Sequence, residues 1–144
     1  MGGAASPHDA GMAPPRILDL VSIAVSLQDM HDRIEVCGPQ AFLVTVSEAG
    51  DAHVVSVVVR RDGDALAFDA GRTSRANLAA RPTATLLWPS RSFDNGEYSL
   101  IVDGDGVVAA DGDEVVVRPT AAVLHRIAGS TGGGPSCIRV LSRD

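Results

Sequence analysis

Residues 53–60 read His-Val-Val-Ser-Val-Val-Val-Arg, with five valines in eight positions. Valine favours the extended backbone of a β-strand, because its branched side chain is restricted in a helix and packs well on a pleated surface. Asp62 and Gly63 follow and are typical of a tight hairpin turn, and residues 65–69 then read as a second strand. This stretch predicts an antiparallel strand pair in the middle of the chain.

Further strands are expected on both sides of this pair. The β-rich runs that predict them are residues 41–47, 83–88, 98–102, 107–110, 115–118 and 137–141, with turns at Asn95-Gly96, at Asp111-Gly112 and in the Gly-rich stretch 129–134. Short helices are expected at 26–35, where Ser26 is the candidate N-cap, at 73–80 and, after Pro119, at 120–128. The pattern is mainly β with short helices (α+β), and strands at hairpin spacing favour a closed antiparallel barrel.

The 144 residues are enough for one domain. Residues 1–16 are rich in Gly, Ala, Pro and Ser and lack hydrophobic periodicity, which predicts a disordered tail before a single domain at residues 17–144. We expect a cytoplasmic protein, because the N-terminus lacks the features of a signal peptide and no apolar run reaches the ~18 residues of a membrane span. Cys37 and Cys137 are then expected to be free thiols, with a disulfide between them as the alternative.

Charge and composition argue against several classes of function. The net charge is −6 and aromatic residues are 3% of the chain, which argues against a nucleic-acid partner. All twelve basic residues are arginines, so no lysine is present for a Schiff base or for a Walker A phosphate loop. The four histidines lack metal-ligand spacing, and the Asp-Gly-Asp triplets at 62–64, 103–105 and 111–113 indicate hairpin turns rather than calcium loops.

The most informative stretch for function is residues 68–75, Phe-Asp-Ala-Gly-Arg-Thr-Ser-Arg. A strand ends here and a helix begins, and the unpaired N–H groups of a helix N-terminus suit a phosphate. Two arginines and two hydroxyl side chains at 72–75 complete a candidate phosphate site, to which Arg60 can add a cation. The alternatives are a solvated turn in which Thr73 or Ser74 caps the helix, and a simple surface charge at Arg60.

Taken in order, these segments resemble the flavin-binding split barrels related to pyridoxamine 5′-phosphate oxidase, a superfamily that includes deazaflavin (F420)-binding reductases. The resemblance covers about residues 41–110. It rests on Ala41-Phe-Leu-Val-Thr-Val, His53 and its valine strand, Phe68, Arg72-Thr-Ser-Arg-Ala-Asn, Arg81-Pro-Thr-Ala-Thr-Leu-Leu-Trp and Tyr98-Ser-Leu-Ile-Val-Asp-Gly. It implies a six-stranded antiparallel split β-barrel that forms a homodimer, with FMN at each subunit boundary.

By position, the resemblance also implies a set of cofactor-binding residues. The backbone of 56–59 would lie along the flavin ring, the side chains at 60 and 72–75 would face the phosphate, and a tryptophan would stack on the ring unless it lies in the core or the dimer interface. These residues are Ser56, Val57, Val58, Val59, Arg60, Arg72, Thr73, Ser74, Arg75 and Trp88. Two positions depart from the oxidases, because Asp69 stands where they place a hydroxyl and Ser74-Arg75 replaces their consecutive Arg-Lys.

The resulting expectation is an FMN-binding protein that performs or assists a flavin-dependent redox step on an unidentified small molecule. True pyridoxamine 5′-phosphate oxidation is not expected, because the basic C-terminal segment that grips that substrate is missing. Two alternatives stay open. One is F420 in place of FMN on the same fold, and the other is a non-catalytic haem- or small-molecule-binding module that has lost the flavin.

Overall fold

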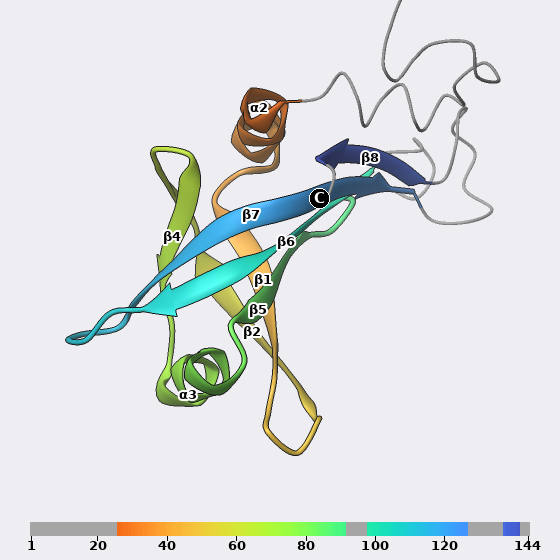
Figure 1. The fold of residues 1–144 in the computed structure, drawn as a ribbon. Helices are drawn as coiled ribbons and strands as arrows, with labels where there is room; N and C mark the ends of the chain where they lie inside the picture. Colours follow the sequence, from red (N-terminus) through yellow and green to blue (C-terminus); the bar gives the residue numbers. More distant parts are fainter. Residues whose placement is uncertain (1–25, 92–97, 127–136, 142–144) are drawn as a thin grey trace, which may run out of the picture.

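The structure is a computed structural model that describes residues 26–91, 98–126 and 137–141 (Figure 1). Within these ranges the chain forms the helices α2 (Leu27–Cys37) and α3 (Arg72–Ala80) and eight antiparallel strands. The strands are β1 (Gln40–Val46), β2 (Ala52–Val58), β3 (Arg60–Asp62), β4 (Ala65–Asp69), β5 (Thr83–Trp88), β6 (Ser99–Val108), β7 (Glu114–His125) and β8 (Cys137–Leu141). This confirms the mainly β fold with short helices. The expected tail, the Asn95-Gly96 turn and the Gly-rich stretch 129–134 lie outside the described residues.

One long, bent strand closes the sheet. β2 and β3 are separated by Val59 alone, whose N–H donates to the Pro39 carbonyl at 2.7 Å. β2 pairs with β1 and β3 pairs with β4, so the strand order β2-β1-β5-β6-β7-β4-β3 begins and ends on the same stretch of chain. The path has seven strands where the resemblance implied six, because Val59 divides one stretch of chain into β2 and β3, and β8 is an additional strand on β7.

β7 shows that the helix expected at residues 120–128 was wrong. Glu114–His125 is a continuous strand that pairs with β6. Ala122 and Leu124 are buried while Val123 between them is only half-buried, which is the period of two of a strand. Pairing with β6 therefore overrides the local helical preference, and Pro119 is tolerated because it lies beside a register shift in the β6–β7 ladder.

Gly104 explains how β6 continues through the Asp-Gly-Asp-Gly stretch 103–106, which separates two of the expected strands. A Cβ atom at this position would lie 2.6 Å from Val117 Cγ1 and even closer to the carbonyl oxygen of Arg118. Only glycine leaves room for β7 at this point, where the register shifts. β6 and β7 consequently form one long antiparallel pair.

The core lies inside the barrel and is filled by side chains from all the long strands. The largest fully buried side chains on the strands are Leu43, Leu66, Phe68, Leu86, Trp88, Leu100, Val102, Val115 and Val117. α3 joins this core through Leu78, which is 2% exposed, and through Asn77, whose amide donates to Thr45 Oγ1 at 3.0 Å. The outward-facing positions of the strands are thereby left for ligands and partners.

α2 and α3 lie at opposite ends of the barrel (Figure 1). α2 begins at the predicted cap, since the Ser26 hydroxyl accepts a hydrogen bond from the Asp29 N–H and the Asp29 carboxylate accepts one from the Ser26 N–H. It ends at Gly38, which has a φ of +93°. Neither described helix combines the length and the apolar character needed to cross a membrane.

Gly104→Ala should lower the free energy of unfolding by about 1–3 kcal/mol, because the added methyl group forces the β7 backbone to move. Gly106→Ala in the same strand is the matched control, since a Cβ atom there lies no closer than 3.4 Å to the flexible tip of Leu78. We expect the control to change stability by less than about 1 kcal/mol. Urea denaturation measures both variants, and equal effects would contradict the close approach at Gly104.

Candidate functional site

A groove runs along β2 on the outside of the barrel, where the resemblance places the flavin ring. Its lining residues are Gln40, Ser56, Val57, Val58, Arg60 and Asp69, and its volume is about 420 Å³, within the range of small-molecule sites. An adjoining hollow of about 360 Å³ shares Gln40 and Ser56 and is also lined by Phe42, Trp88 and Arg91. The pairing of β1 with β2 explains this juxtaposition, because Gln40 lies opposite Val58 and Phe42 lies opposite Ser56.

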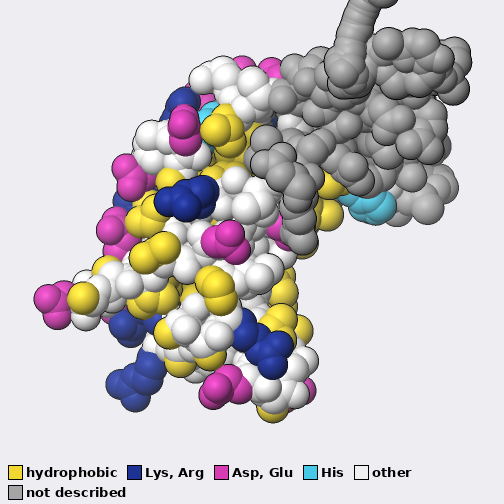
Figure 2. Space-filling view, in the orientation of Figure 1, with side chains coloured by type: hydrophobic (Ala, Val, Ile, Leu, Met, Phe, Trp, Pro, Cys, Tyr) yellow, Lys and Arg dark blue, Asp and Glu magenta, His cyan; other side chains and the backbone are white. Residues whose placement is uncertain are grey.

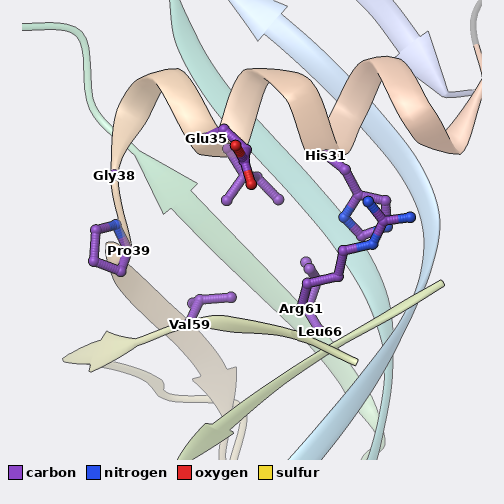
Figure 3. A pocket seen from close by; sticks show the side chains of 8 residues that line it. His31, Glu35, Gly38, Pro39, Val59, Arg61 and Leu66 are labelled. Carbon is purple, nitrogen blue, oxygen red and sulfur yellow. The ribbon is translucent and has the colours of Figure 1, made fainter. Parts of the chain in front are cut away.

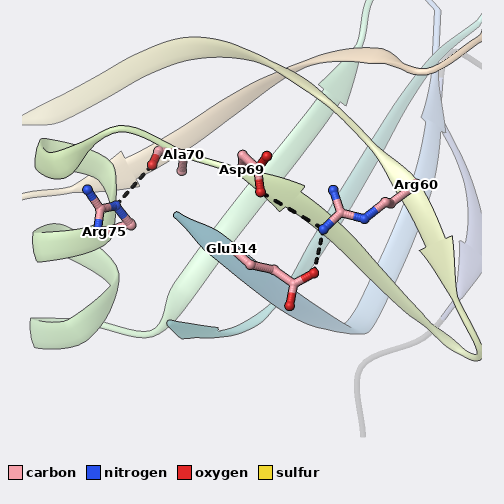
Figure 4. A network of polar contacts seen from close by, with 5 residues as sticks. All are labelled: Arg60, Asp69, Ala70, Arg75 and Glu114. Carbon is pink, nitrogen blue, oxygen red and sulfur yellow. Dashed lines mark hydrogen bonds and ion pairs between the residues drawn. The ribbon is translucent and has the colours of Figure 1, made fainter. Parts of the chain in front are cut away.

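Arg60 is held by two carboxylates at one end of the groove (Figure 4). Its Nη2 atom donates a hydrogen bond to Glu114 and lies 3.9 Å from Asp69 Oδ1. Asp69 and Glu114 lie directly opposite each other on β4 and β7, so these like charges would repel without the guanidinium beside them. All three side chains are substantially exposed, which makes the pairing weak enough to exchange partners.

The start of α3 presents backbone N–H groups without a side-chain cap. Gly71 is the N-cap, so the alternative in which Thr73 or Ser74 caps the helix was wrong. Thr73 is exposed, whereas Ser74 is 1% exposed and faces the interior. Arg72 is also exposed and makes no hydrogen bond or ion pair within the described part of the chain. The first turn therefore offers one uncommitted cation and one accessible hydroxyl.

Arg75, by contrast, ties α3 to the hairpin between β6 and β7. Its Nε donates to the Ala70 carbonyl at 3.0 Å, and its Nη1 donates to the Gly112 carbonyl at 3.1 Å. Its Nη2 lies 3.4 Å from Asp113 Oδ1. The side chain is partly buried, and these contacts fix where α3 begins relative to the barrel; Figure 4 shows the one with Ala70.

Three residues of the implied set contribute to the core. Val57 and Val59 are each 5% exposed and Trp88 is 1% exposed. The indole N–H of Trp88 donates to the Gly38 carbonyl at 2.9 Å, so its polar edge is satisfied inside the protein. Because these side chains point into the core, a ligand on the outer face can contact mainly the backbone at these positions.

The structure thus brings together only part of the set. Ser56, Val57, Val58 and Arg60 line one groove, whereas the lining does not include residues 72–75. Gln40 lines the groove, and Glu114 borders it through its contact with Arg60; neither residue was predicted from the sequence. Period-two alternation along β1 was a signal for Gln40, but no local signal indicates that β7 brings Glu114 beside Asp69.

A separate hollow of about 250 Å³ lies beneath α2 (Figure 3). It is lined by His31, Ile34, Glu35, Gly38, Pro39, Val59, Arg61 and Leu66. Val59 alone among these residues was predicted to bind a cofactor. The available signal was the i, i+3, i+4 spacing of the first three of these residues, which puts them on one face of a helix.

His31 is 3% exposed, and its pKa is lowered from 6.5. Burial is the largest cause, and the positive charge of Arg61 also lowers it. Asp64, through its charge and a backbone hydrogen bond, and the charge of Asp32 act in the opposite direction. The imidazole is therefore mainly neutral at pH 7. The described residues contain no group of three His, Cys, Asp or Glu side chains placed to hold a metal ion.

The outer face of β1 and β2 exposes large apolar side chains beside the groove. Phe42 is 40% exposed, Val54 is 57% exposed and Val58 is 61% exposed. Phe42 pairs with Ser56, and Val54 and Val58 lie two residues before and after Ser56 on β2. Side chains two residues apart on a strand point to the same face, as do those of paired residues, so all three lie on one face. Figure 2 shows that hydrophobic side chains reach the surface of the molecule between the charged ones.

Two curated proteins are similar to this chain over most of its length. One is from Mycobacterium bovis and one from Mycobacterium tuberculosis, and both are uncharacterized. Each is 36% identical over 124 residues, which covers 76% of this chain and 80% of the relative. No model of a known protein family matches the sequence.

Solved structures with a similar fold are more distant in sequence, at 16% identity each. A candidate pyridoxamine 5′-phosphate oxidase from Listeria innocua has a TM-score of 0.56 over 69% of this chain and 98% of that chain. A pyridoxamine 5′-phosphate oxidase-related, FMN-binding protein from Nostoc punctiforme has a TM-score of 0.53 over 90% of both chains. A haem-binding protein from Mycobacterium smegmatis has a TM-score of 0.59 over 79% of this chain but only 57% of that chain. These matches show the split-barrel fold.

Acidification should lower the stability of this protein through His31. The unfolded chain takes up a proton near the ordinary pKa of 6.5, whereas the folded chain does so only at a lower pH. The free energy of unfolding should therefore fall as the pH decreases from 6.5 toward the lowered pKa. Above pH 6.5 His31 should make no contribution to the pH dependence of stability. Denaturant titrations at a series of pH values measure it.

The His31→Phe variant should lose this component of the pH dependence. His125→Gln is the control, because His125 is exposed on β7 and its replacement should leave the slope unchanged. A wild-type slope that survives in His31→Phe would contradict the assignment to His31.

Proposed function

This chain belongs to the family of the two uncharacterized mycobacterial proteins and has the split-barrel fold of the pyridoxamine 5′-phosphate oxidase-like proteins, and on this premise we propose that it binds FMN and performs or assists a flavin-dependent redox step on a small molecule. The observation that carries the proposal is the groove along β2. Its lining includes Ser56, Val57, Val58 and Arg60, four of the residues that the resemblance implied.

The start of α3 fits the phosphate of FMN. Its first turn lacks a side-chain cap, and the positive end of a helix favours an anion. Arg72 and the Thr73 hydroxyl are available for direct contacts, and α3 begins shortly after Asp69, which lines the groove. Arg60 and Arg75 already pair with carboxylates, so we assign them a supporting role.

A bound FMN would supply the electron transfer to or from the substrate. The protein would bind and orient it through the backbone of residues 56–58 and the amide of Gln40, which line the groove. Phe42 and Trp88 line the adjoining hollow and would exclude water beside the ring. Asp69 and Glu114 lie at the end of the groove nearest the start of α3, where they add negative charge beside the proposed phosphate position.

The same carboxylates favour a second candidate function. With Asp69 and Glu114 on Arg60, the site offers less positive charge to a phosphate, and a haem-binding protein shares the fold. A non-catalytic module for haem or another small molecule is therefore the alternative, and F420 in place of FMN is a further one on the same groove. Absorbance spectra of the purified protein with added FMN, F420 or haem distinguish the three.

We also propose that the protein is a homodimer that buries the apolar outer face of β1 and β2. Phe42, Val54 and Val58 are exposed there next to the groove. Burying such side chains is favourable, and twofold symmetry is the commonest way to bury one surface against its copy. A partner on this face would also cover the groove and shield a bound ring from water.

Arg72→Gln should weaken FMN binding roughly ten- to a hundredfold, since a charge-assisted hydrogen bond contributes about 1.5–3 kcal/mol. Riboflavin lacks the phosphate, so its affinity should hardly change. Asp69→Thr should instead tighten FMN, because it removes a negative charge from the groove. Flavin fluorescence titrations measure these affinities, with Arg33→Gln on the exposed surface of α2 as the neutral control.

Equal weakening of FMN and riboflavin by Arg72→Gln would refute the phosphate contact. A wild-type protein that binds neither flavin would overturn FMN as the cofactor and favour the alternatives.

Val54→Lys should convert the dimer to a monomer, because a charge would be buried in the apolar face. Val107→Lys is the matched control, since Val107 is 65% exposed on β6, which β5 separates from β1. Light scattering at micromolar protein concentration measures the mass of each. A monomeric wild type, or dissociation by both substitutions alike, would be inconsistent with the proposed interface.

A further inference from the structure

The hollow beneath α2 is distinct from the groove along β2. Successive side chains of a strand point to opposite sides, so Val58 and Arg60 face the groove while Val59 and Arg61 line the hollow beneath α2. Figure 3 shows the hollow between the underside of α2 and the strands below it. At about 250 Å³ it suits a ligand smaller than a drug-sized molecule.

His31 supplies an unused hydrogen-bonding atom to this hollow. The residue is 3% exposed, and within the described part of the chain its Nε2 has no hydrogen-bond partner. A buried polar atom without a partner costs free energy, so it indicates a group that is satisfied by something bound. A neutral imidazole has one donor and one acceptor nitrogen, so Nε2 can accept a hydrogen bond when Nδ1 carries the proton.

Arg61 supplies a cation to the same hollow. Its Nε donates to the Gly63 carbonyl at 2.9 Å, which orients the side chain. No other side-chain hydrogen bond or ion pair of Arg61 is present among the described residues, so both terminal nitrogens are available for the two oxygens of a carboxylate. Glu35 adds a negative charge to the rim and disfavours ligands with two negative charges.

We propose that this hollow binds a small aliphatic hydroxy acid with a single carboxylate. The carboxylate pairs with Arg61, the hydroxyl donates to His31 Nε2, and the aliphatic part contacts the apolar lining. That lining is Ile34, Pro39, Val59 and Leu66. The proposal does not depend on a bound flavin, because the two sites face opposite sides of the same strand.

A titration of the ¹⁵N-labelled full chain with 2-hydroxyisovalerate, followed by amide NMR shifts, tests the proposal. We expect saturable shifts in α2, β3 and β4 in the millimolar range. Isovalerate, which lacks the hydroxyl, should bind roughly two- to tenfold more weakly, and inorganic phosphate should not bind there.

Two substitutions identify the contacts. Arg61→Gln should weaken 2-hydroxyisovalerate at least about tenfold, and Arg60→Gln, which changes the opposite side of the strand, should not. His31→Phe should remove the preference for the hydroxy acid over isovalerate while the amide spectrum keeps the dispersion of a folded protein. FMN affinity should be the same in Arg61→Gln as in wild type, so this test is separate from that of the flavin site.

The absence of saturable shifts in the wild type would overturn the proposal. Equal weakening by Arg60→Gln and Arg61→Gln, or a preference for the hydroxy acid that persists in His31→Phe, would overturn it as well.

Discussion

The barrel depends on one stretch of chain, residues 52–62, that pairs with two different strands. Its first part forms the ladder with β1 and its second part forms the ladder with β4, and a single residue, Val59, separates them. Because the backbone is shared, neither ladder can shift register without moving the other. The alternation of this strand also directs Ser56, Val58 and Arg60 outward and sends Val59 and Arg61 toward α2. Both candidate sites therefore follow from the same strand.

The distribution of charge decides what these sites can bind. The chain is acidic overall, and the arginines near the groove are largely occupied by carboxylates and carbonyls. Arg60 offsets the repulsion between Asp69 and Glu114, and Arg75 joins α3 to the β6–β7 hairpin. Arg72 and Arg61 are less committed, which is why the proposed anionic contacts fall on these two. A carboxylate beside the proposed phosphate position costs affinity unless it is paired, and Arg60 reduces that cost for Asp69.

Strands bounded by local signals were predicted well. β4 and β5 have the predicted limits, since each is a short apolar run between turn residues, and Ser26 caps α2 through the pattern seen in the sequence. The error at residues 120–128 has a different origin. Alanine and leucine favour a helix locally, but the long β6 strand offers hydrogen-bond partners along their whole length, and burial of Ala122 and Leu124 follows.

The sequence by itself determined the β-rich class and the hairpins, because these depend on neighbours in the chain. It singled out residues 56–60 and 72–75 as candidate site residues, partly through the family resemblance. It also determined the acidic charge and the absence of lysine. Only the tertiary structure decided which of those residues lie together. Glu114 meets Arg60 and Asp69 because β7 pairs with β4, and His31 meets Arg61 because α2 covers one end of the barrel. Such contacts join residues far apart in the chain, so they form only when the sheet closes.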